Sequence, residues 1–282
     1  MKRSNKLLAL LLIGTLSLSA CGNQDAKTDA PAETKTEEKA EETPAENSEE
    51  ATEENAEAPE ESAEEAPAEE AAADDVEVKE ITGEELDKIE EDNKEKEKYL
   101  VIDVRSLDDY NNGHIKHALS IPAEELESRL GEIEAWKDKN VVVYANKADD
   151  SKEAYKTLAD NGFTNLFNAP GIEDFTYTTI TKAKTVLAEE FKKLAESGDY
   201  TILDGRDAKD YEAGHMPGAI NVPSDQVDEI IPTLPTDKPF LAHCYSGNKS
   251  FVIADKLASE GKEVINAFDG TKEYDGYDLS EK

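Results

Sequence analysis

Apolar residues in the C-terminal three quarters of the chain fall into short runs separated by polar, turn-forming residues. The runs Tyr99–Val104 and Asn140–Tyr144 are mainly apolar and too short for helices, which predicts buried parallel strands. Helical patterns flank them. Thr82-Gly-Glu-Glu85 reads as a capping box that opens a helix through about Lys94, and a second helix is predicted over Ser151–Asn161. Alternating strands and helices predict an α/β fold with a mostly parallel sheet.

This pattern occurs twice. Asp103-Val-Arg105 recurs as Asp204-Gly-Arg206, 101 residues later. At the same offset, Tyr110, Gly113, His114, Ala118 and Pro122 recur as Tyr211, Gly214, His215, Ala219 and Pro223. A repeat that keeps residue types over this length predicts two copies of one domain. We place them at residues 76–180 and 181–282, and Ala188–Ser197, closed by Gly198, is the predicted opening helix of the second copy.

Residues 22–75 differ in composition from both copies. They contain no aromatic or branched aliphatic residue, and they carry 21 Asp and Glu against 3 Lys, about half of the chain's net charge of −35. Such a segment cannot bury enough apolar surface to offset its conformational entropy, so we expect a disordered acidic linker. An acidic chain without a basic stripe also argues against a nucleic-acid partner.

The N-terminal residues 1–21 have the pattern of a targeting segment. Lys2 and Arg3 form a basic start, an apolar run follows that is too short to span a bilayer, and Leu18-Ser-Ala-Cys21 ends it. This resembles the lipobox of bacterial lipoproteins, which implies lipidation of Cys21 and anchoring at the extracytoplasmic face of the cell membrane. An ordinary cleaved signal peptide or an uncleaved anchor are the alternatives. With Cys21 modified, Cys244 is the only free thiol.

The motifs of the second copy resemble the rhodanese (sulfurtransferase) family. They are Asp204-Gly-Arg206, Tyr211-Glu-Ala-Gly-His-Met-Pro-Gly-Ala-Ile-Asn-Val-Pro223 and Cys244-Tyr-Ser-Gly-Asn-Lys-Ser250. The resemblance implies a five-stranded, mostly parallel sheet flanked by helices in each copy, and an active cysteine in the loop after a strand. It also implies sulfur transfer through a persulfide.

Elementary chemistry also points to residues 244–250 as the active site. Cys244 lies between a predicted strand and a predicted helix, where backbone N–H groups and the positive helix end favour a thiolate. Gly247 lets the backbone curl closely, Lys249 adds a cation, and Ser250 suits a helix N-cap. We assign catalysis to Cys244 and substrate binding to Tyr245, Ser246, Gly247, Asn248, Lys249, Ser250 and Arg206.

Several of these residues have a plainer interpretation. Cys244 could be an inert buried thiol. Asp204 and Arg206 have counterparts in the first copy, which favours a structural ion pair over substrate binding. His114 and His215 also correspond to each other, which favours a structural role as turn residues. His243 precedes Cys244 on a strand, so its side chain should point to the opposite face.

The predicted reaction needs a small sulfur donor, such as thiosulfate or a persulfide, and an acceptor such as cyanide or a thiol, including a protein thiol. No metal or organic cofactor is required. One alternative is a non-catalytic persulfide carrier, which would use the same loop. The other is a phosphatase or arsenate reductase, but relatives of that kind have a loop one residue longer, closed by Arg.

The first copy lacks the chemistry of the second. Ala145 stands at the position of the nucleophile and Ala148 at that of the glycine, and Asp149 and Asp150 replace the polar and cationic residues. Two carboxylates would repel an anionic donor. We therefore expect the first copy to be inactive and to have a structural role, covering the rim of the active loop.

Overall fold

The computed structural model describes residues 77–282, which lie in one compact unit. The predicted signal peptide with Cys21 and the predicted linker lie outside the described residues. Within residues 77–282, none of the helices is both long and apolar enough to cross a bilayer. Below, residues 77–180 are called the first repeat and residues 181–282 the second repeat.

Helices and strands alternate through both repeats. The first repeat contains α1 (Gly83–Glu91), α2 (Asn93–Lys96), β1 (Tyr99–Asp103), α3 (Leu107–Asn112), β2 (His114–Ile115), β3 (Leu119–Ser120), α4 (Ala123–Arg129), the 3-10 helix η1 (Leu130–Trp136), β4 (Asn140–Tyr144), α5 (Lys152–Asp160) and β5 (Asn165–Asn168). From the junction onward follow β6 (Ile180–Thr181), β7 (Lys184–Val186), α6 (Ala188–Ser197), β8 (Thr201–Asp204), α7 (Ala208–Ala213), β9 (Ile220–Asn221), α8 (Val227–Ile230), η2 (Ile231–Thr233), β10 (Phe240–His243), α9 (Asn248–Ser259) and β11 (Val264–Ala267).

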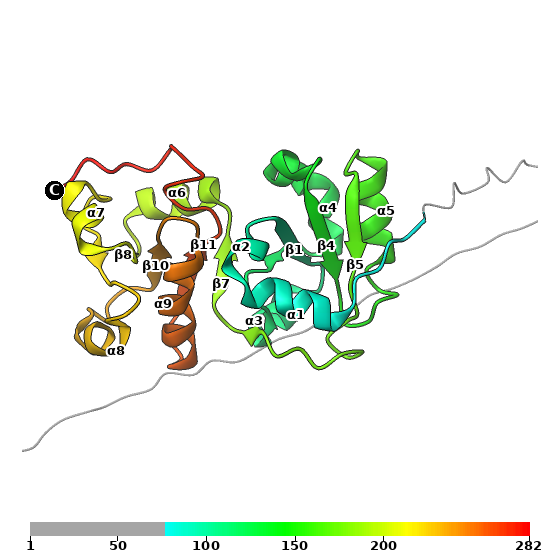
Figure 1. The fold of residues 1–282 in the computed structure, drawn as a ribbon, viewed down its shortest axis with the longest axis horizontal. Helices are drawn as coiled ribbons and strands as arrows, with labels where there is room; N and C mark the ends of the chain where they lie inside the picture. The colour runs from blue at the N-terminus through cyan, green and yellow to red at the C-terminus, as the bar shows by residue number, and fades with distance from the viewer. Residues whose placement is uncertain (1–76) are drawn as a thin grey trace, which may run out of the picture. The chain divides into compact units, whose positions relative to one another are not determined.

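The larger sheet is parallel and has the strand order β5-β4-β1-β3-β7-β11-β10-β8-β9. The second repeat supplies five of these strands. The first supplies four, and a bridge between Glu80 and Asn168 continues the sheet beside β5. The predicted α/β class and parallel sheet are confirmed. The strands of the two repeats form one sheet because β3 pairs with β7, through the single pair Leu119↔Thr185. Figure 1 shows β7 between the two repeats.

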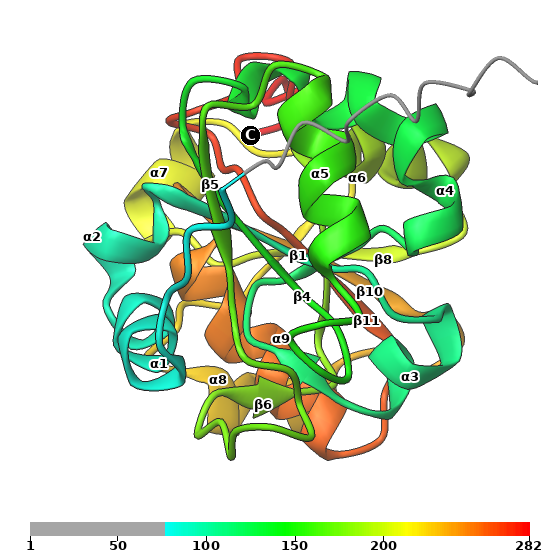
Figure 2. The same cartoon turned by 90° about the vertical axis from the view of Figure 1, so that its right-hand side faces the viewer.

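Helices cover both faces of the sheet, as Figure 2 shows, with α4, α5 and α6 on one side and α1, α8 and α9 on the other. Alternate residues of each strand supply the two cores. In β1, Leu100 and Ile102 pack with α4 and α5, whereas Val101 packs with Leu86 of α1. This period of two is what a strand buried on both faces requires. Phe268 of the second repeat joins the core beneath α4 and α5.

Helix ends agree with the predicted signals in most places. Thr82 and Glu85 form the capping box of α1, and Gly198 ends α6 with a left-handed φ of 75°. One helix was predicted through about Lys94, but Asp92 interrupts it: its backbone is extended and its carboxylate caps α2. A second difference concerns Ser250, which is not an N-cap because α9 already begins at Asn248, with Gly247 as its N-cap.

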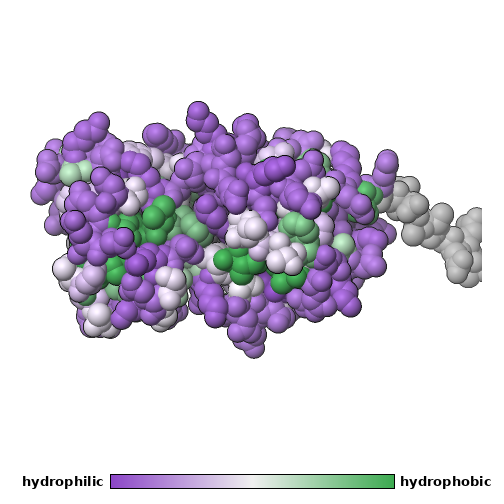
Figure 3. Space-filling model, turned by 60° about the horizontal axis from the view of Figure 1, so that its bottom comes forward, coloured by the Kyte–Doolittle hydropathy of each residue, from purple (hydrophilic) through white to green (hydrophobic). Residues whose placement is uncertain are grey.

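The surface shown in Figure 3 is mainly hydrophilic, with small separate apolar patches over both repeats. Among residues 77–282, the exposed large apolar residues are Leu107, Ile180 and Val252. Isolated apolar residues of this kind are ordinary on a folded domain.

Candidate functional site

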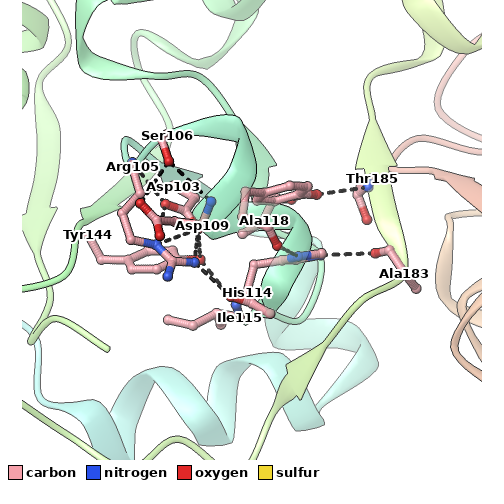
Figure 4. A network of polar contacts seen from close by, with 12 residues as sticks. Asp103, Arg105, Ser106, Asp109, His114, Ile115, Ala118, Tyr144, Ala183 and Thr185 are labelled. Atoms are coloured by element: carbon pink, nitrogen blue, oxygen red, sulfur yellow. Dashed lines mark hydrogen bonds and ion pairs between the residues drawn. The ribbon is translucent and has the colours of Figure 1, made fainter. Parts of the chain in front are cut away.

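An ion pair at the end of a central strand supports the site region in each repeat. In the second repeat, Arg206 Nη2 lies 2.6 Å from Asp204 Oδ2 and donates to the carbonyl oxygen of Gly214 at 2.7 Å. Both charged side chains are buried. In the first repeat, Arg105 makes the same contacts with Asp103 and Gly113, at 2.6 and 2.8 Å (Figure 4). Because all these Arg206 contacts are internal, the structure favours the structural interpretation of Arg206 over substrate binding.

Both motif histidines stack on a tyrosine beside this ion pair. The ring centroids of Tyr110 and His114 are 3.6 Å apart, and those of Tyr211 and His215 are 3.8 Å apart. In the first repeat this pair also reaches the second. The backbone N–H of Thr185 donates to Tyr110 Oη at 3.1 Å, and His114 Nε2 lies 3.1 Å from the Ala183 carbonyl oxygen (Figure 4). The motif residues of the first repeat therefore help to join the repeats.

Cys244 follows β10 directly, at the beginning of the loop that leads into α9; residues 244–250 are called the Cys244 loop below. The thiol is free, and Cys244 is 1% exposed. Ser250 Oγ lies 3.4 Å from Cys244 Sγ and can donate a hydrogen bond to it. Gly247 turns the chain with φ 77°. The 12-residue helix α9 begins four residues after Cys244, so the Cys244 loop lies at the positive end of the helix dipole.

The backbone N–H groups of the Cys244 loop carry free hydrogen-bonding capacity. In the part of the chain that the structure describes, the N–H groups of residues 245–250 donate to no protein acceptor. The next N–H along the chain, that of Phe251, donates to the Gly247 carbonyl oxygen at 3.0 Å. Unpaired N–H groups that follow one another beside a helix start form an anion-binding site.

In the equivalent loop of the first repeat, residues 145–151, backbone N–H groups donate to carboxylates of the same repeat. The N–H of Ala148 donates to Asp174 Oδ2 at 2.7 Å, and that of Lys147 donates to Asp150 Oδ2 at 3.2 Å. Asp149 pairs with Lys152. Ala145, at the nucleophile position, is buried and carries no reactive group. This loop holds internal anions where the Cys244 loop has free donors, which agrees with the predicted inactivity of the first repeat.

The rim of the Cys244 loop is built around Tyr245. Its hydroxyl donates to Asp210 Oδ2 and accepts the backbone N–H of Asp207 at 3.3 Å. Partial burial, with the Asp210 contact second, raises the pKa of Tyr245 to about 12, so the phenol stays neutral. Lys249 lies over the ring but also pairs with Asp207 at 2.6 Å. Its positive charge is therefore partly neutralised, and Tyr245 forms a fixed aromatic wall.

His243 lies on the far side of the strand from this chemistry. It is fully buried, packs near the rings of Phe191 and Tyr277, and its Nε2 is 3.8 Å from Asp204 Oδ2. Burial lowers the pKa of His243 to about 4, which keeps the ring neutral near pH 7. This position agrees with the expected orientation and gives His243 no route to the sulfur as a proton donor.

Two contributors to the site were missed by the sequence reasoning. Asn266 of β11 donates through Nδ2 to the Gly247 carbonyl oxygen at 3.2 Å, as Asn168 does to Ala148 at 2.8 Å. This pair could have been found, because the repeat brings the two asparagines into alignment. The other is Lys96 of α2, which contacts the Cys244 loop from the first repeat. It lies in a run of charged residues that carries no recognisable signal.

Curated relatives match single repeats of the chain. The chain is 31% identical over 90 residues to YrkF of Bacillus subtilis, whose name marks it as a candidate sulfur carrier protein; the match covers 31% of this chain and 49% of YrkF. It is 29% identical over 91 residues to the thiosulfate sulfurtransferase GlpE of Pseudomonas savastanoi, covering 32% of this chain and 85% of GlpE. The chain thus spans about half the length of YrkF.

A family model matches both repeats, and a solved structure of a named sulfurtransferase is similar to the chain as well. The thiosulfate sulfurtransferase of Pseudomonas aeruginosa is 18% identical, with a TM-score of 0.32, and the match covers 69% of this chain and 41% of that one. The model of the rhodanese-like domain matches residues 84–175 and again residues 187–276, together more than half of the chain. The repeat, the parallel sheet and this double match show that the chain belongs to the rhodanese-like family, with two domains in tandem.

Proposed function

We propose that this protein is a lipid-anchored sulfurtransferase at the extracytoplasmic face of the cell membrane. It moves sulfane sulfur from thiosulfate or a persulfide donor to cyanide or a thiol, through a persulfide on Cys244. The observation that carries the proposal is the contrast between the two loops. The loop with the thiol has free N–H donors, and the loop without it is filled by Asp150 and Asp174.

The reaction proceeds in two displacements. The Cys244 thiolate attacks the outer sulfur of thiosulfate, a new S–S bond forms, and the bond to the sulfonate group breaks, with its electron pair leaving on sulfite. The terminal sulfur of the persulfide then carries the negative charge, which the free loop N–H groups and the α9 N-terminus stabilise. The acceptor attacks this terminal sulfur, and the electron pair of the broken S–S bond returns to Cys244. No external oxidant or reductant is consumed.

Mass spectrometry of the intact protein tests the chemistry. After brief mixing with thiosulfate and removal of the donor, residues 22–282 should carry the mass of one additional sulfur atom, located on Cys244 and lost again on addition of cyanide. A protein that never gains this mass with any sulfane donor would contradict the proposal.

The carrier hypothesis shares the first half of this reaction. It is favoured by the similarity to YrkF. Steady-state turnover separates the two functions. An enzyme releases many thiocyanate molecules per Cys244 with thiosulfate and cyanide in excess, whereas a carrier that gives its sulfur only to a partner protein gains the sulfur but releases almost no thiocyanate.

The lipid anchor is tested through Cys21. The intact chain should be found in the membrane fraction, and the Cys21→Ala chain should be soluble or should keep an uncleaved N-terminus, because the thioether to the lipid can no longer form. Cys244→Ala serves as the control and should stay in the membrane fraction. Unchanged membrane association of mature Cys21→Ala protein would refute lipidation at this residue.

A further inference from the structure

Lys96, the last residue of α2 in the first repeat, reaches into the Cys244 loop of the second. Its side chain is buried, with 1% exposed. Nζ donates to the carbonyl oxygen of Phe268 at 3.0 Å and to that of Ser246 at 3.4 Å. Ser246 is two residues after the nucleophile. The repeat without a nucleophile therefore places a cationic side chain against the loop that contains it.

The surroundings of Lys96 fit an ammonium group. Two carbonyl oxygens and the face of the Phe268 ring, whose centroid is 3.7 Å from Nζ, give acceptors for three donors. Lys96 forms no ion pair with the carboxylates of residues 77–282 at 4.0 Å or less. A buried charge without a direct partner is costly, so its position calls for a compensating anion nearby.

The charges around Lys96 show which anions are close enough to matter. Burial lowers the pKa of Lys96, and four acidic groups oppose that change when they are ionised: first Glu90, then Glu273, Asp269 and Cys244. The first three are carboxyl groups of the protein framework. Cys244 is the one whose negative charge moves in the proposed reaction, from the thiolate sulfur to the terminal sulfur of the persulfide and back.

The contact with Ser246 also fixes the direction of a loop donor. In a trans peptide the C=O and the following N–H point in opposite directions. Holding the Ser246 carbonyl toward Lys96 therefore turns the N–H of Gly247, which has no protein acceptor among residues 77–282, to the other side. Phe268 is equally relevant, because its carbonyl oxygen lies against Gly247. The Lys96 side chain thus holds both carbonyl groups that lie next to Gly247, those of Ser246 and Phe268.

Neighbouring contacts hold α2 on the loop. Asn248 Nδ2 donates to the carbonyl oxygen of Asn93, at the start of α2, at 3.2 Å and to Glu97 Oε1, just after α2, at 2.9 Å. Lys96 lies between these two contact points in the sequence. The whole of α2 is therefore fitted to the Cys244 loop.

We propose that Lys96 is a positioning residue that the inactive repeat supplies to the Cys244 site: it orients the loop peptides and places a positive charge beside the anionic sulfur. This assignment rests on the proposed sulfur transfer. It extends the role expected for the first repeat from covering the rim to supplying an electrostatic element of the site.

The charge can be measured without sulfur transfer, by alkylating Cys244 with iodoacetate, an anion, and with iodoacetamide, its neutral analogue. Access and loop order affect both rates, so their ratio reports the local positive charge. We expect Lys96→Met to lower the iodoacetate-to-iodoacetamide ratio about tenfold, as for the loss of one nearby charge, and Lys96→Arg to keep it within about twofold. Lys96→Gln, which keeps a donor but no charge, should behave as Lys96→Met and gives a second variant if that one folds poorly.

Lys116 offers the matched control. It also belongs to the first repeat and lies over a ring of the second, with Nζ 5.2 Å from the Phe251 centroid, but it donates to the Glu90 carbonyl oxygen rather than to the loop. Lys116→Met should leave the ratio unchanged. An equal ratio in Lys96→Met, Lys116→Met and the unaltered protein would overturn the role of Lys96, even if sulfur transfer is intact. Absence of a persulfide in the unaltered protein would instead remove the proposed function, whatever the ratio.

Discussion

A Cys244→Ser protein should lose sulfur transfer by at least about a thousandfold, to the uncatalysed background. A serine hydroxyl is a much weaker nucleophile near neutral pH and cannot form the persulfide. The fold should be unaffected, because the oxygen is smaller than sulfur and Ser250 Oγ, now 3.4 Å from Sγ, remains within reach of it. Thiocyanate formation from thiosulfate and cyanide measures the loss, and circular dichroism checks the fold.

The first repeat provides the control for this substitution. Ala145 occupies the equivalent place in a loop whose N–H groups already have carboxylate acceptors, so Ala145→Ser should leave turnover within about twofold. If Cys244→Ser retained more than a few per cent of the activity, another residue would have to be the nucleophile.

Replacing Gly247 with alanine should have the second largest effect. Gly247 has φ 77°, and a Cβ there would lie 2.5 Å from the Ala267 carbonyl oxygen and closer still to that of Phe268. Both are backbone atoms next to β11, so the loop must move instead. The loop donors would then leave their positions, and we expect kcat/KM for thiosulfate to fall about a hundredfold or more. The overpacking should also lower the free energy of unfolding of the Gly247→Ala protein by about 1–3 kcal/mol.

Gly261 separates the steric effect from the backbone effect. It has nearly the same φ, 75°, lies beyond the other end of α9, and a Cβ there would meet no atom within 4 Å. Gly261→Ala should cost about 1–2 kcal/mol of stability from its left-handed backbone alone and should leave kcat/KM unchanged. Equal activity losses in the two variants would show that Gly247 acts through general stability and not through the loop. Urea unfolding and steady-state kinetics on the same samples provide both quantities.

Much of the fold could be predicted because the sequence describes it twice. The spacing of Asp103 and Arg105, repeated at Asp204 and Arg206, aligns the two copies without any contact being known. β4 and α6 have the predicted bounds, since an apolar run and a glycine at the helix end are local signals. The Cys244 loop was placed by its residues alone, because a thiol, a glycine and a helix start are adjacent in the chain.

The features that were missed depend on distant contacts. β3 has two residues and β7 has three, and they join through one residue pair. The sequence of neither strand indicates its partner. Lys96 contacts residues 150 and 172 positions away, so its role is decided by tertiary packing. Ser250 was assigned to the N-cap by residue type, but Gly247 already makes the turn, and α9 begins two residues before Ser250.

The pairing of β3 with β7 has a consequence for how the chain can be divided. In the second repeat alone, β7 would become an edge strand, with unpaired N–H and C=O groups facing solvent, and such edges invite pairing with other chains. Phe268 would lose the Trp136 ring against which it packs. We therefore expect the second repeat to need the first for its stability, and the pair of domains to be the smallest unit of this protein that folds on its own.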